Sequence, residues 1–150
     1  MGFIRAIGLG LVLLVLTLNL AACATMADQP PSLYQRLGGR EGIALVVDDF
    51  VANMVADARV KARFQGMQPP AVFKLRSNLA DQICDATGGP CAYLGRDMKT
   101  THKEMSISDA EWNATVENLT KALGKNNVAA KDQSELLGLL GPMKADIVGQ

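Results

Sequence analysis

Apolar residues recur at steps of three and four along most of the chain beyond residue 32, which is the spacing of one face of an α-helix. No run alternates apolar and polar residues as a half-buried strand would. The pattern therefore predicts an all-α domain. The clearest stripe lies between Glu41 and Ala56 and consists of Ile43, Val46, Val47, Phe50, Val51 and Met54.

Glycine, proline and capping residues divide this pattern into separate segments. Ser32 is placed to cap a short first helix, and Ser108 and Glu111 have the spacing of a capping box. We expect Pro69-Pro70 to break the chain before a third long segment. Only one or two helical turns are expected between residues 89 and 108. The predicted helices cover residues 33–37, 41–56, 60–64, 72–87, 108–124 and 136–147, the last broken at Gly141-Pro142.

The N-terminal residues have the composition of a targeting signal. One positive charge at Arg5 is followed by an apolar stretch over 6–20, and Leu20-Ala21-Ala22-Cys23 at its end resembles a bacterial lipobox. The alternative is an uncleaved membrane helix, but a span needs about 20 apolar residues and this run is shorter. We therefore expect a lipoprotein signal peptide over 1–22, a lipidated tether over 23–31 and one folded domain over 32–150.

Lipidation of Cys23 would attach the exported chain to a membrane, because two or more acyl chains anchor a protein stably. Ala24 follows the cysteine where an acidic residue often retains such proteins in the inner membrane. An anchor in the outer membrane, facing the periplasm, is therefore expected, with the inner membrane as the second choice.

The chain beyond residue 22 is nearly neutral, with 14 basic and 15 acidic side chains among its 128 residues. A domain of this length can bury a sufficient core without disulfide or metal staples, so a cofactor would be present for function. The lack of any basic run argues against a nucleic-acid partner.

His102 is the chain's only histidine and lies in its least regular part. A lone histidine is commonly an exposed or hydrogen-bonded structural residue. No zinc-ligand set accompanies it, and the Cys-x-x-Cys-His sequence of covalently attached haem is absent. What one neutral imidazole in an apolar helical pocket can do is hold haem iron, which takes its in-plane ligands from the porphyrin.

Several motifs resemble those of the group I truncated haemoglobins. The resemblance implies a two-over-two helical sandwich, the truncated globin fold, with haem b held non-covalently between the helices. It also implies reversible binding of a diatomic gas, namely oxygen, nitric oxide or carbon monoxide. The motifs are Ser32-Leu-Tyr-Gln-Arg-Leu-Gly-Gly39, Val47-Asp-Asp-Phe50, Phe64, Gly88-Gly89-Pro90 and Tyr93-Leu-Gly-Arg-Asp-Met-Lys-Thr-Thr-His102.

The same resemblance implies roles for individual residues. His102 matches the proximal iron ligand, Phe50 the phenylalanine against the haem edge, and Phe64 the one that stacks over the distal ring. Met98, one helical turn before His102, would lie on the same side of the haem. Tyr93 belongs to the expected cofactor-binding set as well. Plain core packing is compatible with the same phenylalanine and methionine positions.

The sequence departs from the family on the distal side of the expected site. Val51 stands where the family usually has a tyrosine that donates a hydrogen bond to dioxygen. Leu75 and Leu79 fall where polar residues, often glutamine, are usual. With Phe64 and Ile83, these residues predict an unusually apolar distal pocket.

Dioxygen gains negative charge on binding, so a missing donor should weaken its binding more than that of carbon monoxide or nitric oxide. Asn78 and Gln82 are the nearest candidate donors, but helical spacing turns Asn78 away from the Leu75 and Leu79 stripe.

Three functions are compatible with the sequence. The first is a gas-binding haem protein on a membrane anchor, with no dedicated enzymatic activity. The second is a haem redox enzyme that removes nitric oxide or peroxide, which the missing tyrosine disfavours. The third is a haem-free, globin-like interaction lipoprotein. The sequence names no redox partner for any of them.

Cys84 and Cys91 remain after Cys23 is assigned to lipid. Disulfides form in exported proteins, and the chain reverses direction at the glycines between the two cysteines. Either these residues are bridged or they are two free thiols, because a bridge needs α-carbons within about 7 Å.

Overall fold

The computed structural model describes residues 30–150, and the predictions that fall on the signal peptide, Cys23 and most of the tether lie outside it. This part of the chain contains no β-strand, only an isolated bridge between Ile107 and Val148. None of its helices is long and apolar enough to cross a membrane. The elements in chain order are α2 (Leu33–Arg36), α3 (Gly39–Ala56), η2 (Lys61–Phe64), α4 (Pro69–Ala86), α5 (Met98–His102), α6 (Asp109–Lys125), α7 (Ala130–Leu140) and η3 (Gly141–Asp146), where η marks a 3₁₀ helix.

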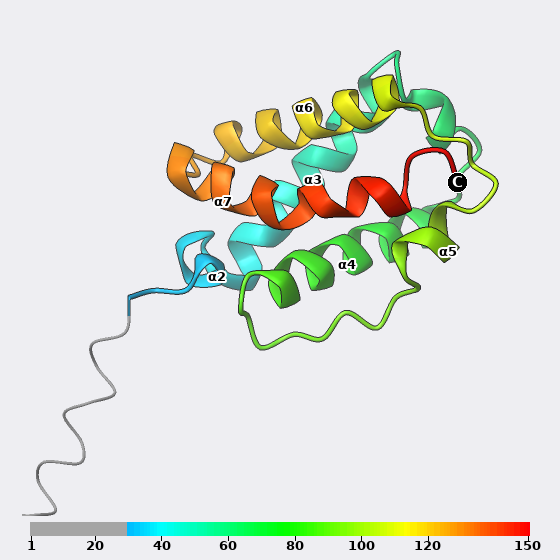
Figure 1. Cartoon of the computed structure of the whole chain (residues 1–150). Helices are drawn as coiled ribbons and strands as arrows, with labels where there is room; N and C mark the ends of the chain where they lie inside the picture. Colours follow the sequence, from blue (N-terminus) through cyan, green and yellow to red (C-terminus); the bar gives the residue numbers. More distant parts are fainter. Residues whose placement is uncertain (1–29) are drawn as a thin grey trace, which may run out of the picture. The chain divides into compact units, whose positions relative to one another are not determined.

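Four long helices form two layers, with α3 and α4 in one and α6 and α7 in the other (Figure 1). Helix α3 packs against both α4 and α6 and therefore lies at the centre of the domain. The short helix α5 and the irregular chain around it lie beside one end of α4. This arrangement confirms the predicted all-α, two-over-two sandwich.

The core is built on the stripe of α3 that the sequence predicts, and all six of its apolar residues are buried. Residues from the other long helices complete the core, since each brings one apolar face to α3. The least exposed of these are Ile83 and Cys84 of α4, Ala114, Ala122 and Leu123 of α6, and Leu136 of α7.

Both predicted capping motifs are present and fix where their helices begin. Ser32 and Gln35 form a capping box at α2, and Ser108 and Glu111 form one at α6. In each box the serine oxygen accepts a hydrogen bond from the backbone of the fourth residue, whose side chain accepts one from the serine backbone.

The prediction that Pro69-Pro70 would precede the third long helix was wrong in one respect. These prolines are the first two residues of α4. The first turn of a helix leaves its N–H groups without intrahelical partners, so a residue that lacks an N–H and has a fixed φ is well suited there.

The predicted break in the last helix is confirmed at Gly141-Pro142, where α7 gives way to η3. Proline removes one backbone hydrogen bond at this point. The chain changes course, and Met143 and Ile147 line a cavity next to α5.

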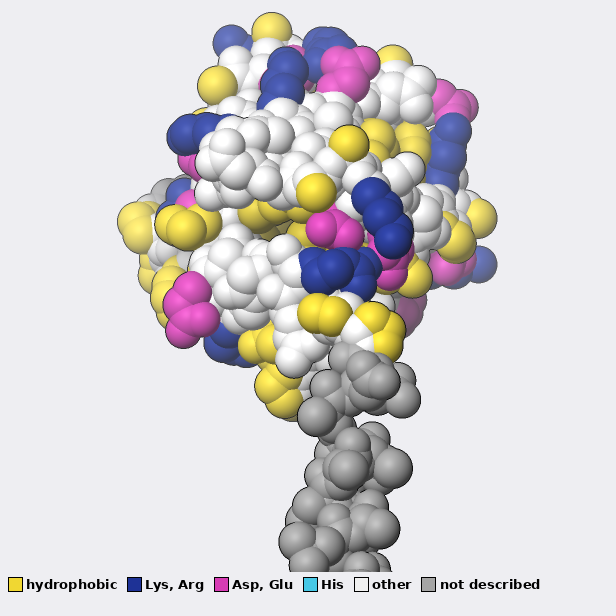
Figure 2. Space-filling model, turned by 90° about the vertical axis from the view of Figure 1, so that its left-hand side faces the viewer, with side chains coloured by type: hydrophobic (Ala, Val, Ile, Leu, Met, Phe, Trp, Pro, Cys, Tyr) yellow, Lys and Arg dark blue, Asp and Glu magenta, His cyan; other side chains and the backbone are white. Residues whose placement is uncertain are grey.

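On the face shown in Figure 2, positive and negative side chains are interspersed and no broad patch of one sign is visible. Within the part of the chain that the structure describes, charged side chains also pair across elements, as Arg36 does with Asp132 and Arg40 with Asp81. This face therefore mixes acidic and basic side chains, in keeping with their nearly equal numbers in the sequence.

Candidate functional site

Two adjoining cavities lie between the layers, with volumes of about 330 and 380 Å³. Each falls within the range of about 300–1,000 Å³ that is typical of small-molecule and cofactor sites. The cavities share six lining residues, so their walls are continuous. The shared residues are Phe50, Leu79, His102, Trp112, Thr115 and Ile147.

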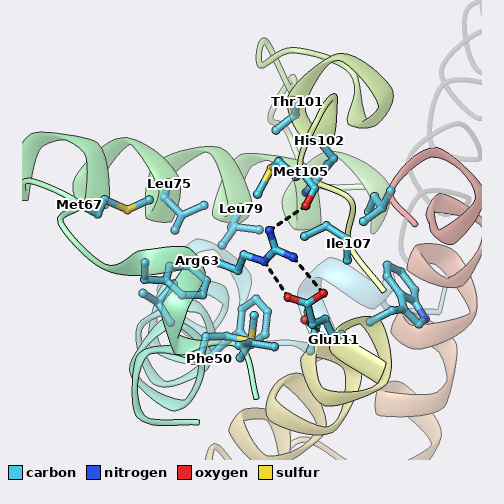
Figure 3. A pocket seen from close by; sticks show the side chains of 17 residues that line it. Phe50, Arg63, Met67, Leu75, Leu79, Thr101, His102, Met105, Ile107 and Glu111 are labelled. Carbon is cyan, nitrogen blue, oxygen red and sulfur yellow. Dashed lines mark hydrogen bonds and ion pairs between the residues drawn. The ribbon is translucent and has the colours of Figure 1, made fainter. Parts of the chain in front are cut away.

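The walls of both cavities are largely apolar. One wall of the first cavity comes from α3, η2 and α4, and we call it the α3–α4 wall; its residues include Phe50, Val51, Phe64, Leu75 and Leu79. The facing α5–α6 wall includes His102, Met105, Ile107 and Trp112 (Figure 3). A flat apolar ligand between these walls would contact His102 on one side and the α4 leucines on the other.

His102 is oriented by its own helix. Asp97 caps α5 by accepting a hydrogen bond of 2.8 Å from the Thr100 backbone, and His102 is the helix's last residue. The His102 Nδ1 lies 2.8 Å from the Met98 carbonyl oxygen. A carbonyl can only accept, so Nδ1 is the donor, and in a neutral ring Nε2 keeps its lone pair. The geometry leaves one imidazole nitrogen free to bind a metal ion held in the cavity.

An ion pair that the sequence analysis did not predict lines the first cavity. Arg63 of η2 donates from Nε and Nη2 to the Glu111 carboxylate at 2.7 and 3.0 Å, and from Nη1 to the Met105 carbonyl at 2.7 Å (Figure 3). The hydrogen bond from Arg63 is the main reason that the pKa of Glu111 falls to about 2, and Ser108 lowers it further. Both members of the pair are therefore charged at neutral pH.

Two further polar side chains at the cavities, those of Thr115 and Gln82, have nearby partners. Thr115 donates to the Glu111 carbonyl at 2.9 Å. Gln82 lines the second cavity, and its amide lies 3.6 and 3.4 Å from the sulfurs of Met98 and Met143. Asn78 lines neither cavity, as helical spacing predicted.

The five methionines between residues 30 and 150 all line one cavity or the other. Met54, Met67 and Met105 line the first, and Met98 and Met143 the second. Methionine has three rotatable bonds and fills irregular gaps, so these walls can adapt to the outline of a large ligand.

Most of the predicted cofactor-binding residues come together at this site. Phe50, Val51, Phe64, Leu75 and Leu79 line the first cavity with His102, whereas Ile83 and Met98 line the second.

Tyr93 is the exception, since the structure does not bring it to either cavity, and its place in the cofactor-binding set stays a prediction. Its hydroxyl donates to the Arg96 carbonyl at 2.7 Å, and its side chain lines neither cavity. Burial raises the pKa of this phenol. Tyr93 therefore shapes the loop that leads to α5.

Cys84 and Cys91 are joined by a disulfide, with their α-carbons 5.8 Å apart. The bond links the end of α4 to the loop that precedes α5. Arg40 of α3 lies over this link, since its Nη1 is 3.1 Å from the Cys91 sulfur and its Nη2 is 2.9 Å from Asp81. The disulfide thus ties the start of the loop that leads to α5 to the C-terminal end of α4.

The chain belongs to the bacterial-like globin family, whose model matches residues 32–148. The group 1 truncated hemoglobin GlbN of Mycolicibacterium paratuberculosis is 29% identical over 119 residues, which cover 79% of this chain and 85% of the relative. The Fe(III) form of truncated hemoglobin from Tetrahymena pyriformis has a TM-score of 0.75 at 26% identity, covering 80% of this chain and 100% of that one. The 2/2 hemoglobin of Synechococcus sp., solved in the cyanomet state with covalently attached heme, has a TM-score of 0.71 at 27% identity, covering 79% and 98%.

This family implies a haem cofactor, and the residues present fit one. The two cavities provide continuous apolar walls, and His102 presents a free imidazole nitrogen where they meet. Haem would supply an iron centre that His102 could ligate and that can bind a small gas molecule.

Proposed function

We propose that this chain binds haem b non-covalently through His102 and uses it to bind a diatomic gas reversibly. The observation that supports the proposal most directly is the position of the sole histidine, which lies where two apolar cavities meet and has Nδ1 already engaged by the Met98 carbonyl. Globins as a family bind diatomic gases, which supports the same function.

Non-covalent attachment of the haem is supported because the histidine and the cysteines that could form a covalent bond to it have other roles. The chain's one histidine is the iron ligand in this proposal. Cys84 and Cys91 are bonded to each other, so neither is a free thiol near the cavities. Residues 30–150 therefore offer neither a spare imidazole nor a thiol for a covalent bond to the haem.

The α3–α4 wall supports a preference among gases. Val51, Leu75 and Leu79 present only hydrocarbon to the first cavity. Bound dioxygen gains about 1–3 kcal/mol from a hydrogen-bond donor in a low-dielectric pocket, whereas carbon monoxide gains much less. We therefore expect this pocket to hold carbon monoxide well and to release dioxygen quickly.

Visible spectroscopy tests the proposal directly. The chain purified from its own membrane should carry haem and, once reduced, should bind carbon monoxide and release it unchanged when the gas is removed. Absence of haem, both as isolated and after incubation with hemin, would exclude the proposal and leave a haem-free interaction protein. Rapid consumption of nitric oxide or peroxide with a reductant would identify a redox enzyme instead.

The membrane anchor is a proposal that rests on the sequence of residues 20–24. Its support is the small, apolar Leu-Ala-Ala triplet directly before Cys23. We expect the wild-type chain to enter the detergent phase after export and Cys23→Ser to stay in the aqueous phase, since the variant has no thiol at this position to acylate. Equal partitioning of both chains would contradict the anchor.

A further inference from the structure

The segment that follows His102 has an unusual backbone. Glu104 and Ser106 both take left-handed conformations, with φ of 65° and 47°, although neither is glycine. Such conformations cost free energy and persist where surrounding contacts hold them. The segment 103–108 joins the helix that carries His102 to α6, so these contacts bear on the position of His102.

Hydrogen bonds hold this segment from both sides. On one side, the Ser106 N–H donates to the Gln150 carbonyl at 2.7 Å, and the Gly149 N–H donates to the Ile107 carbonyl at 2.9 Å. On the other side, Arg63 Nη1 donates to the Met105 carbonyl, which lies between the two left-handed residues.

The Arg63 contact differs from the others because it crosses the cavity. Arg63 precedes Phe64 in η2, on the α3–α4 wall, whereas Met105 and Glu111 belong to the α5–α6 wall. Glu111 is itself fixed, since the Ser108 N–H and hydroxyl both donate to its carboxylate at 2.9 Å. One guanidinium thus joins the α3–α4 wall to the middle of the strained segment, at Met105, and to the first turn of α6, at Glu111.

The ion pair is well placed to act locally. Many residues between 30 and 150 line the two cavities. Among them, Arg63 and Glu111 are the only arginine, lysine, aspartate or glutamate residues. Their side chains are 33% and 19% exposed. Partly exposed ion pairs contribute little to global stability, but a bidentate guanidinium fixes geometry strongly.

We propose that Arg63 is a positioning residue for His102: its hydrogen bonds to Met105 and Glu111 hold the 103–108 segment in place and thereby set the imidazole against the cofactor. The proposal rests on the proposed haem function. Without Arg63, the segment keeps its contacts to Gly149 and Gln150 but is no longer tied to the α3–α4 wall. His102 would then bind iron in a less defined position, and the cofactor would leave more easily.

Arg36 supplies a matched control. Like Arg63, it donates to carboxylate oxygens and to one backbone carbonyl, although its carboxylates come from two residues, Asp132 and Glu135, and its carbonyl from Pro31. It lies outside both cavities and joins α2 to α7. Arg63→Met and Arg36→Met therefore remove the same kinds of contact in different places.

The first measurement uses the full chain without haem. Arg63→Met should speed amide hydrogen exchange at Met105 and Ser106 by at least about tenfold, because local opening of the segment becomes easier. Arg36→Met should leave these amides unchanged. Equal exchange at these amides in wild type and Arg63→Met would overturn the proposal whether or not the protein binds haem.

The second measurement uses the haem-loaded chain. Arg63→Met should shift the iron–imidazole stretching frequency of the reduced protein and speed haem transfer to an acceptor globin by on the order of 10- to 100-fold, as for other groups that orient a metal ligand. Arg63→Lys keeps the charge without the bidentate fork. It should therefore show a smaller frequency shift and a smaller rise in the haem-transfer rate than Arg63→Met. An unchanged frequency and transfer rate in Arg63→Met would refute positioning. Failure of the wild-type chain to take up haem would refute the proposed function and leave the exchange result to decide the role of Arg63.

Discussion

Replacing His102 with glycine is expected to abolish stable haem binding. No other histidine exists to take over the iron, and the remaining cavity walls are largely apolar, with the Glu111 carboxylate already paired to Arg63. Even groups that only orient a metal ligand are worth about 10- to 100-fold in affinity, so loss of the ligand itself should accelerate haem loss by more than about 100-fold. The measurement is haem transfer to an acceptor globin, followed by the Soret absorbance.

A second glycine variant separates loss of the ligand from damage to the helix. Thr100→Gly places the same helix-weakening residue on α5, at an exposed position two residues earlier. It should retain haem, and free imidazole added to His102→Gly should restore part of the Soret band. A normal Soret band in His102→Gly without added imidazole would show that His102 is not the ligand.

Val51→Tyr is expected to slow dioxygen dissociation by at least about tenfold. Val51 is buried on α3, is 3% exposed and lines the first cavity, so a phenol there would point into the ligand space. A new hydrogen bond of about 1.4 kcal/mol corresponds to a factor of ten in the dissociation rate. Stopped-flow replacement of dioxygen by carbon monoxide measures this rate.

Val51→Phe is the matched control, because it adds the ring without the hydroxyl. If the effect is a hydrogen bond, the tyrosine variant should be slow and the phenylalanine variant should resemble the wild type. Equal slowing in both variants would indicate that the ring blocks the exit of the gas. No change in either, with haem in place, would mean that Val51 does not face the bound gas.

The helices could be predicted from sequence because their signals are local. The stripe of α3 follows the helical period, and the serine that starts α6 is paired with a glutamate three residues later. Pro69 was misplaced because proline both ends helices and begins them, and the local sequence does not distinguish the two uses.

The residues of the site were predictable where a family motif covers them or where their chemistry is unique in the chain. His102 was found because it is the sole histidine, whereas the ion pair of Arg63 and Glu111 joins residues 48 positions apart and leaves no periodic signal. Glu111 already had a local explanation as a capping residue. The motif around Tyr93 did not indicate that this side chain would lie outside both cavities, because a motif gives the order of residues along the chain but not the direction in which each side chain points.

The methionines of the two cavities also determine where oxidation would damage this domain. Oxidation converts a thioether into a polar sulfoxide, which disrupts apolar packing. Every methionine between residues 30 and 150 lines a cavity wall, and Met67 is the most exposed of the cavity methionines, at 37%. In the described domain, methionine oxidation therefore falls on the cavity walls, while α6 and α7 contain no methionine to oxidise.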